Sequence, residues 1–217
     1  MAKKVTITKE FLMNEYSKFI LENAKKPHTI FHFCQHLKIE EKDFYQFFPS
    51  FEKIEEQVFD NFFENTIELL HKSDEYSNYD AKTKLLSFYF TYFELMTANR
   101  SLVLYLLETD KMKLQNLKKL ASFRIHFKQF IDSLNIKTFE IPQETIQKIQ
   151  EKSVSEASWI QFLMTLKFWI DDTSPSFEKT DVFIEKSIHA SFDLLDLSPI
   201  KNIIDFGKFL WNEKVKM

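Results

Sequence analysis

The stretch "KIEEKDFYQFFPSFEKI" (Lys38–Ile54) decides the fold that the rest of the chain is expected to adopt. It reads as a short helix that carries Tyr45, a Phe-Pro-Ser stop, and the beginning of another amphipathic helix. Proline disfavours helical geometry in the residue before it, and the serine that follows can cap the next helix. This pattern is typical of the second half of a helix-turn-helix. Its front edge, however, carries Glu40, Glu41 and Asp43, which raises the question of whether the unit reads DNA.

The composition of the 217-residue chain predicts an all-α protein. One Gly and five Pro are far below the usual content of both residues. Hairpins between strands depend on Gly at positive φ, so a sheet is not expected. The length allows one large domain or two small ones packed closely together, and the 25 Phe supply apolar side chains for the core.

Charge and cysteine content predict a cytoplasmic protein. The net charge of -3 gives no global attraction to nucleic acid. The single cysteine, Cys34, excludes an internal disulfide and fits a reducing compartment. Charges are interspersed through the first residues, unlike a signal peptide, and no apolar run approaches the roughly 18 residues of a membrane span.

Apolar residues at helical spacing, together with capping residues, predict about ten helices. Thr8 is expected to cap the first, and helices over Ile30–Leu37 and Glu40–Phe48 follow before one that begins after Ser50. The polar segment Lys72–Asp80 is expected to link these to a longer bundle. The helices of that bundle are expected at Ala81–Thr97, Leu102–Glu108, Lys111–Leu134, Pro142–Ile170, Phe177–Asp196 and Ser198–Trp211.

A capping Thr29, the pair Phe33-Cys34, Ile39 after a turn and "FYQFFPS" (Phe44–Ser50) follow one another along the first third of the chain. This order resembles the DNA-binding domain of the TetR/AcrR family of bacterial regulators. That domain has a capping Thr, an Ile-Ala pair, a Gly turn and a Leu-Tyr-x-x-Phe-Pro-Ser motif. The resemblance implies a helix-turn-helix DNA-binding-like domain over residues 1–50 and a bundle for ligand binding and dimerisation over residues 51–217.

The chain departs from the family pattern where DNA would be contacted. Lys38 occupies the Gly turn position, so either a non-glycine residue adopts positive φ or the turn has another shape. The acidic front edge favours the helix dipole but repels phosphates, which dominate the affinity for DNA. Tyr45 and Phe48 could instead be core anchors of the three-helix unit. Their match to the family motif would then indicate the fold and not DNA binding. The candidate DNA contacts that remain are Thr29, Lys42, Tyr45 and Gln46, with Lys25 and Lys26 from the flank.

The middle helices concentrate aromatic and Met side chains, in a region that encloses a hydrophobic effector pocket in the resembled family. Apolar pockets with a few polar groups are typical small-molecule sites, although ordinary core packing would use the same residues. A small hydrophobic ligand is therefore expected, with a candidate set of Phe88, Tyr89, Tyr92, Phe93, Met96 and Tyr105.

Two long apolar stripes near the C-terminus predict a homodimer. Paired with their symmetry mates, the two helices would bury the stripes as a four-helix interface, whereas the alternative is burial against the chain's own core. The family resemblance favours the dimer. The candidate interface residues are Trp159, Phe162, Leu166, Phe183, Ile188 and Phe192.

A second, shorter resemblance concerns "FWIDDTSPSFEKTDVFIEKSI" (Phe168–Ile188), which is similar to the end of TetR-fold lipid-binding proteins of coenzyme Q biosynthesis. The matching positions include Asp172, Ser174 and Thr180. That family implies TetR architecture without DNA binding and a terminal amphipathic helix that meets membranes. Ser198–Trp211 is such a helix, and it either docks on the bundle or makes a peripheral membrane contact.

Other constellations point to no further chemistry. His28, His32 and His36 are spaced by four, but no carboxylate or Cys completes a ligand set, so neither a metal nor another cofactor is expected. The sequence has no Gly-rich phosphate loop and no nucleophile elbow, so we expect no enzyme. The leading interpretation is a dimeric, effector-responsive TetR/AcrR-like regulator that binds duplex DNA. The alternative is a TetR-fold lipid- or isoprenoid-binding accessory protein that has lost DNA binding.

Overall fold

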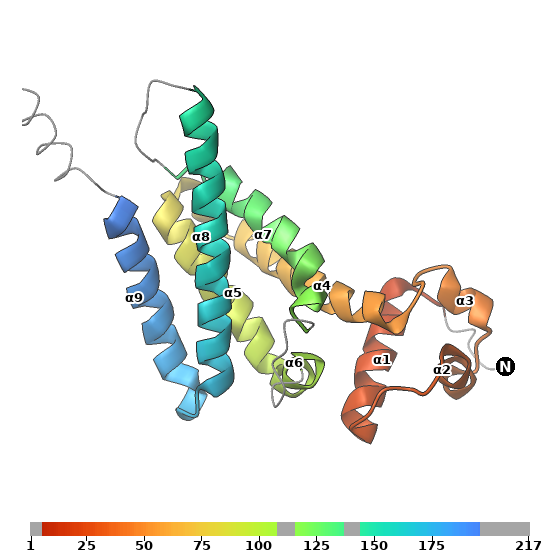
Figure 1. The fold of residues 1–217 in the computed structure, drawn as a ribbon. Helices are drawn as coiled ribbons and strands as arrows, with labels where there is room; N and C mark the ends of the chain where they lie inside the picture. The colour runs from red at the N-terminus through yellow and green to blue at the C-terminus, as the bar shows by residue number, and fades with distance from the viewer. Residues whose placement is uncertain (1–5, 108–115, 137–143, 196–217) are drawn as a thin grey trace, which may run out of the picture. The chain divides into compact units, whose positions relative to one another are not determined.

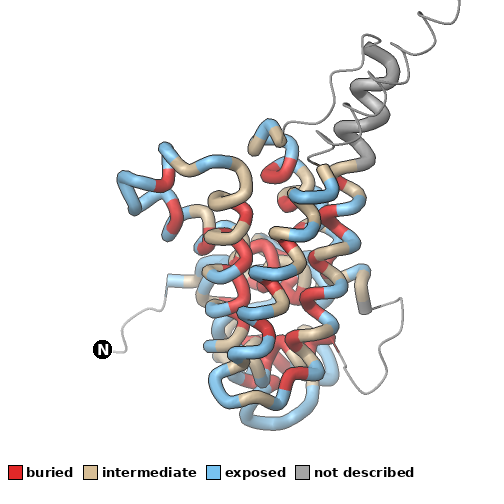
Figure 2. The backbone as a smooth tube through the Cα atoms, turned by 90° about the vertical axis from the view of Figure 1, so that its left-hand side faces the viewer, coloured by how far each residue is buried: buried red, intermediate tan, exposed pale blue. Residues whose placement is uncertain are grey.

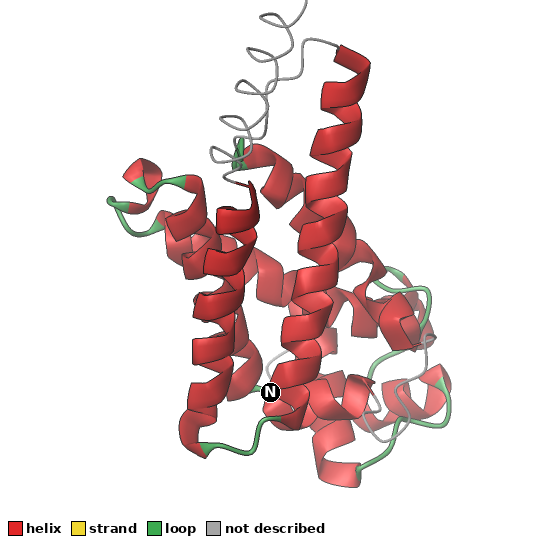
Figure 3. Cartoon of the chain, turned by 60° about the vertical axis from the view of Figure 1, so that its left-hand side comes forward, coloured by secondary structure: helices red, strands yellow, loops and turns green. Residues whose placement is uncertain are grey.

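The computed structural model describes residues 6–107, 116–136 and 144–195 of the chain, and these residues form helices and loops without a strand (Figures 1 and 3). This confirms the all-α prediction. The elements in chain order are α1 (Lys9–Asn23), α2 (Ile30–Leu37), α3 (Glu41–Tyr45), α4 (Phe51–His71), η1 (Tyr76–Asn78), α5 (Ala81–Ala98), α6 (Arg100–Leu107), η3 (Asn116–Leu120), α7 (Ala121–Ser133), α8 (Glu144–Asp171), η4 (Pro175–Phe177) and α9 (Glu178–Leu195).

Several helices begin or end one or two residues away from their predicted bounds, and two elements differ by more. The helix expected over Glu40–Phe48 ends earlier, because α3 stops at Tyr45 and turns toward Pro49. The described part of the helix expected over Lys111–Leu134 begins as the 3-10 turn η3 and becomes α-helical only from Ala121. The expected helix Ser198–Trp211 lies outside the described residues.

The chain divides into two compact units. Unit 1 comprises residues 1–74 and 91–127, and unit 2 comprises residues 75–90 and 128–217. The helices α1 to α3 therefore share a unit with α4, α6 and η3, while α8 and α9 belong to the other. In Figure 2, buried positions alternate with exposed ones along the helices, which is the pattern of amphipathic helices around a core. The functional boundary at residue 50 stays a prediction.

The headpiece, which is our name for α1, α2 and α3, has an aromatic interior. The ring of Tyr16 stacks at 5.0 Å on Phe51, the first residue of α4, and meets the edge of Phe33 at 5.9 Å. Phe44 closes the cluster, with ring centroids 6.2 Å from Phe33 and 5.8 Å from Phe51. Aromatic pairs in such edge-to-face and stacked geometries add specificity to apolar burial. Cys34, the neighbour of Phe33 in the sequence, is buried as well.

The turn between α2 and α3 retains its geometry without glycine. Lys38 lies in the left-handed region with φ of 58°. Its N–H donates to the Gln35 carbonyl at 3.1 Å, while the N–H of Ile39 donates to the Cys34 carbonyl at 3.0 Å. These two bonds form a Schellman motif, which satisfies carbonyls at the end of α2. Of the two alternatives left open by the sequence, the structure has the positive φ.

Two acids of the front edge start α3. The N–H of Glu40 donates to Asp43 Oδ2 at 3.1 Å, and the Glu40 side chain accepts from the Asp43 backbone, which completes a capping box. A helix of five residues has few internal hydrogen bonds, so such capping matters more than in a long helix. Local stability therefore explains part of the acidic front edge.

In unit 2, α8 and α9 form a hairpin whose turn is organised by Asp172. Its Oδ1 accepts from the Ser174 N–H at 2.8 Å and the Ser174 hydroxyl at 2.6 Å, and its Oδ2 accepts from the Thr180 N–H at 2.9 Å and the Thr180 hydroxyl at 2.7 Å. Burial by itself would raise the pKa of Asp172, but these hydrogen bonds outweigh it and lower the pKa to about 2. Asp172, Ser174 and Thr180, which match the TetR-fold lipid-binding proteins in sequence, thus form the hydrogen-bonded turn between α8 and α9.

Candidate functional site

The exposed edge of the headpiece is the candidate DNA interface. Tyr45 is 52% exposed, and its ring only meets the edge of the buried Phe44. Phe48 is 3% exposed. The core-anchor interpretation therefore fits Phe48, while the tyrosine is presented to solvent. Gln46 and Thr29 are also exposed, and the Thr29 hydroxyl oxygen accepts from the His32 N–H at 3.1 Å as the cap of α2.

Positive charge at this edge is offset by its own acids. Lys42 Nζ lies 2.6 Å from Glu40 Oε2, and this hydrogen bond raises the pKa of Lys42. Glu41 is exposed beside them, whereas Lys25 and Lys38 are exposed nearby in the sequence. A pair in which both side chains are this accessible contributes little to stability and can open, so Lys42 stays accessible to a phosphate.

Lys26, which was predicted to approach DNA, has a different neighbour. Its Nζ lies 2.6 Å from Oε1 of Glu55 on α4, a carboxylate whose side chain has 0% exposure. Tyr16 donates its hydroxyl proton to the same oxygen at 2.7 Å, and Lys119 Nζ of η3 lies 3.1 Å from Oε2. Sequence reasoning missed this cluster because its members lie far apart in the chain, and no periodicity pairs them.

The predicted ligand-binding residues are divided between the two units, and five of the six are buried. Phe88 stacks on Phe130 at 4.7 Å in unit 2, and Tyr92 stacks on Phe123 at 4.9 Å in unit 1. Burial raises the pKa of the Tyr89 phenol, as it does that of Tyr92. The buried members are Phe88, Tyr89, Tyr92, Phe93 and Met96, while Tyr105 is partly exposed. In this conformation they pack as core, and their ligand role stays a prediction.

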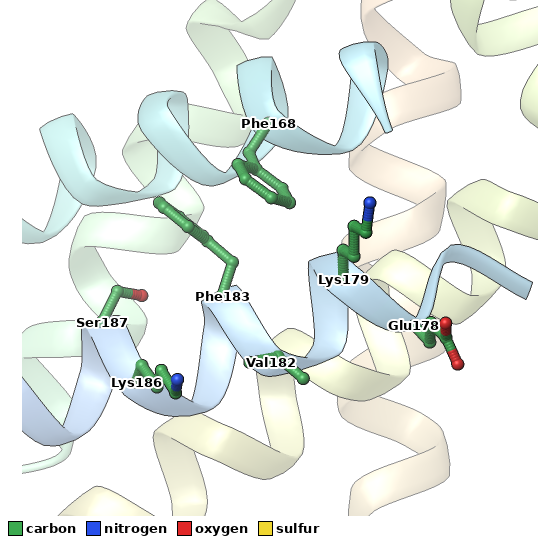
Figure 4. Close-up of a pocket in the computed structure, with 7 residues that line it drawn as sticks. All are labelled: Phe168, Glu178, Lys179, Val182, Phe183, Lys186 and Ser187. Atoms are coloured by element: carbon green, nitrogen blue, oxygen red, sulfur yellow. The ribbon is translucent and has the colours of Figure 1, made fainter. Parts of the chain in front are cut away.

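A groove of about 600 Å³ lies on unit 2 along α8 and α9 (Figure 4). Phe168 of α8 and Phe183 of α9 stack in it with ring centroids 4.5 Å apart. The groove is lined by Phe168, Glu178, Lys179, Val182, Phe183, Lys186 and Ser187. Two cations, one carboxylate and an apolar floor therefore share one accessible surface.

The same surface of α8 carries an exposed apolar stripe. Ile160 is 58% exposed and Met164 is 59% exposed, and both lie at four-residue spacing with Phe168. On α9, Val182 and Leu194 are exposed as well. We call the stripe and the groove together the outer face. Sequence analysis missed the stripe because α8 is apolar on more than one side.

The predicted dimer residues lie mostly inside unit 2. Trp159 stacks on Phe162 at 5.5 Å. Phe183 and Phe192 are partly exposed, whereas the buried members are Trp159, Phe162, Leu166 and Ile188. Burial within one chain accounts for these four side chains, so they need no partner. Their place in a dimer interface stays a prediction.

The three histidines at four-residue spacing pack differently from a metal site. His36 meets the edge of Phe19 at 5.3 Å, and the rings of His28 and His32 lie 6.3 Å apart. Within residues 6–107, 116–136 and 144–195, no three His, Cys, Asp or Glu side chains come together as metal ligands would. Over the same residues, no helix has the length and apolar content to cross a membrane.

The sequence matches the family model of the tetracyclin repressor-like C-terminal domain over residues 84–210. This match covers more than half of the chain and includes α6, η3, α7, α8 and α9. Comparison with curated proteins finds no match, and neither does comparison with solved structures. The family match and the all-helical architecture agree with the headpiece motif, which lies outside the matched residues. The chain belongs to the TetR family of regulators.

Proposed function

We propose that this TetR-family protein is a dimeric transcriptional regulator that binds duplex DNA through α2 and α3 and responds to a small hydrophobic effector. The observation that carries the DNA part is the exposure of Tyr45 on a short helix that follows a capped α2 and a Schellman turn. A helix-turn-helix presents its second helix to the major groove in this way.

The charges of the headpiece support only modest affinity for DNA. Each phosphate contact releases counterions, so affinity depends on how many cations reach the backbone. Lys26 is held by Glu55, and Lys42 has Glu40 as a competing partner. Exposed Lys25 and Lys38 remain. We therefore expect weak binding that falls steeply as the salt concentration rises.

The outer face supports a dimer. Exposed Ile160, Met164 and Val182 lie on the same two adjacent helices as the stacked pair of Phe168 and Phe183. Apolar surface of this kind on paired helices is best removed from water by the same surface of a second copy, which would produce a four-helix interface. Two DNA-binding headpieces would then be held in one assembly.

The effector part rests on the aromatic side chains of α5. Since Tyr89 and Tyr92 are packed as core in this conformation, an apolar ligand would have to displace side-chain contacts to enter. Such a ligand would favour a second arrangement of the helices, and the population of the DNA-binding arrangement would change with it.

The DNA part is tested by the double variant Glu40→Ser/Glu41→Lys. Fluorescence anisotropy with labelled mixed-sequence duplexes should show tighter binding, because two acids that face phosphate are replaced by a neutral cap and a cation. The control Glu64→Ser/Glu68→Lys makes the same change in charge on exposed positions of α4. If both variants gain equally, only net charge matters, and α3 is not at a groove.

The acidic front edge also favours the alternative, a lipid- or isoprenoid-binding accessory protein without DNA binding. In such a protein, Glu40, Glu41 and Asp43 would not weaken function by repelling phosphates, because no DNA is bound. The membrane contact predicted for Ser198–Trp211 lies outside the described residues. Co-sedimentation of the full-length protein with anionic liposomes, together with absent DNA binding by the parent and the double variant, would favour this alternative.

A further inference from the structure

The buried carboxylate of Glu55 joins three separate segments of unit 1. It lies on α4 and receives the Tyr16 hydroxyl from α1, Lys26 from the α1–α2 link and Lys119 from η3. Lys119 also donates to the Leu106 carbonyl at the end of α6. A buried carboxylate requires paired charge and hydrogen bonds, so each of these segments is held to Glu55 and not only to its neighbour along the chain.

The electrostatics of the cluster agree with this geometry. Burial raises the pKa of Tyr16, and so does the negative charge of Glu55, so the phenol stays protonated and acts as a donor. The pKa of Glu52 is lowered first by a hydrogen bond from Ser50, with smaller contributions from Lys26 and Lys119. Two lysines are thus balanced by two carboxylates, although only Glu55 is fully buried.

The cluster spans two functional parts of the family architecture. α6 and η3 fall within residues 84–210, the match to the tetracyclin repressor-like C-terminal domain, whereas Tyr16 lies on α1 of the headpiece and Lys26 in the link that joins α1 to α2. The link that carries Lys26 leads directly to Thr29, the cap of α2. Separating charged groups in a buried cluster costs much free energy. A displacement of Lys119 is therefore expected to move Glu55 and, through it, Lys26 and the α1–α2 link.

We propose that Glu55 is a positioning residue that sets the α1–α2 link, and with it the start of α2, according to where α6 and η3 hold Lys119. The carboxylate itself does not contact DNA. Its role is to transmit a shift of the C-terminal-domain helices to the headpiece within unit 1. The coupling itself is argued from the contacts of Glu55. Only its biological role rests on the proposed function, because the position of α2 matters to a protein that binds DNA.

The test is hydrogen–deuterium exchange of the full-length protein without DNA or effector. Lys119→Met keeps the length of the side chain but removes its charge, so Glu55 loses one of two cations. Residues 17–29 contain no direct partner of Lys119, whose contacts are Glu55 and the Leu106 carbonyl. The amides of residues 17–29 should nevertheless exchange about tenfold faster than in the parent. The control Lys118→Met changes an exposed neighbour on the same turn and should leave these residues unchanged.

Two outcomes would overturn the proposal. Faster exchange confined to α6 and η3 would show that Lys119 only secures its own segment. An equal rise in residues 17–29 and in residues 62–70 of α4 would show a general loss of stability. The double variant Lys26→Met/Lys119→Met gives a second measurement, since its effect should differ from the sum of the single effects if both lysines act through Glu55. A parent that binds no DNA would sink the proposed function but leave this exchange result intact.

Discussion

The capping network of Asp172 yields a quantitative prediction for stability. Its pKa falls from an ordinary 3.8 to about 2 in the folded protein. One pKa unit corresponds to about 1.4 kcal/mol, so the ionised carboxylate contributes about 2 kcal/mol to the free energy of unfolding. The change Asp172→Asn removes this contribution and turns an amide NH₂ toward the donors at Thr180. We expect a loss of about 2–3 kcal/mol near neutral pH.

The direction of the pH dependence follows from the lowered pKa. The contribution is fully present above the unfolded pKa of 3.8 and is lost as the pH falls through the folded value of about 2. The difference between parent and Asp172→Asn should therefore shrink as the pH is lowered below about 4. Urea denaturation followed by Trp fluorescence would measure it, since Trp169 is buried close to the turn in sequence.

The neighbouring Asp171 supplies a matched control. It is exposed and pairs with Lys167 one turn earlier on α8, so Asp171→Asn should cost less than about 1 kcal/mol. If Asp172→Asn costs no more than Asp171→Asn, the network does not stabilise the hairpin. A parent–variant difference that stays constant from neutral pH to about pH 3 would refute the ionised state as its cause.

Two further predictions concern the headpiece turn and the outer face. Lys38→Gly should raise the free energy of unfolding by about 0.5–1 kcal/mol, because Lys38 adopts φ of 58°, whereas the control Lys38→Ala should give no gain; thermal denaturation would decide. Met164→Glu places a charge on the outer face and should yield a monomer in sedimentation, while Ile125→Glu, at an equally exposed position of α7, should not. A parent that already sediments as a monomer at micromolar concentration would exclude the proposed dimer.

Local rules predicted much of the fold. α2 begins and ends where the sequence placed it, and both Thr8 and Thr29 cap helices as expected, because these features depend on residues only a few positions apart. The shorter α3 was missed since helical propensity does not show where a turn toward Pro49 begins. Helix ends are set by hydrogen bonds of one or two residues, which a pattern locates only approximately.

The site was harder to predict because it depends on which side of a helix meets which neighbour. α8 has apolar residues both toward Trp169 and along Ile160 and Met164, so spacing alone does not separate core from interface. The partners Lys26 and Glu55 are likewise joined only by the folded chain. Charge pairs between distant segments leave no periodic signal, although a Glu within the apolar stripe of α4 is a hint that sequence analysis could have used.

The three acids at the front edge of α3 have different roles. Glu40 and Asp43 form the capping box, so they stabilise a helix of five residues. The same two carboxylates also repel DNA phosphates, so their effect on DNA affinity accompanies their effect on helix stability. Glu41 takes no part in the box and lies exposed at the first helical position, where its charge gains only from the helix dipole. Serine is itself a good N-cap, so Glu40→Ser keeps the start of α3, and Glu41→Lys changes charge without touching a cap. The double variant therefore alters electrostatics with little change in stability. A gain in DNA affinity larger than that of the control Glu64→Ser/Glu68→Lys would mean that the helix-turn-helix is intact and that its local charge limits binding.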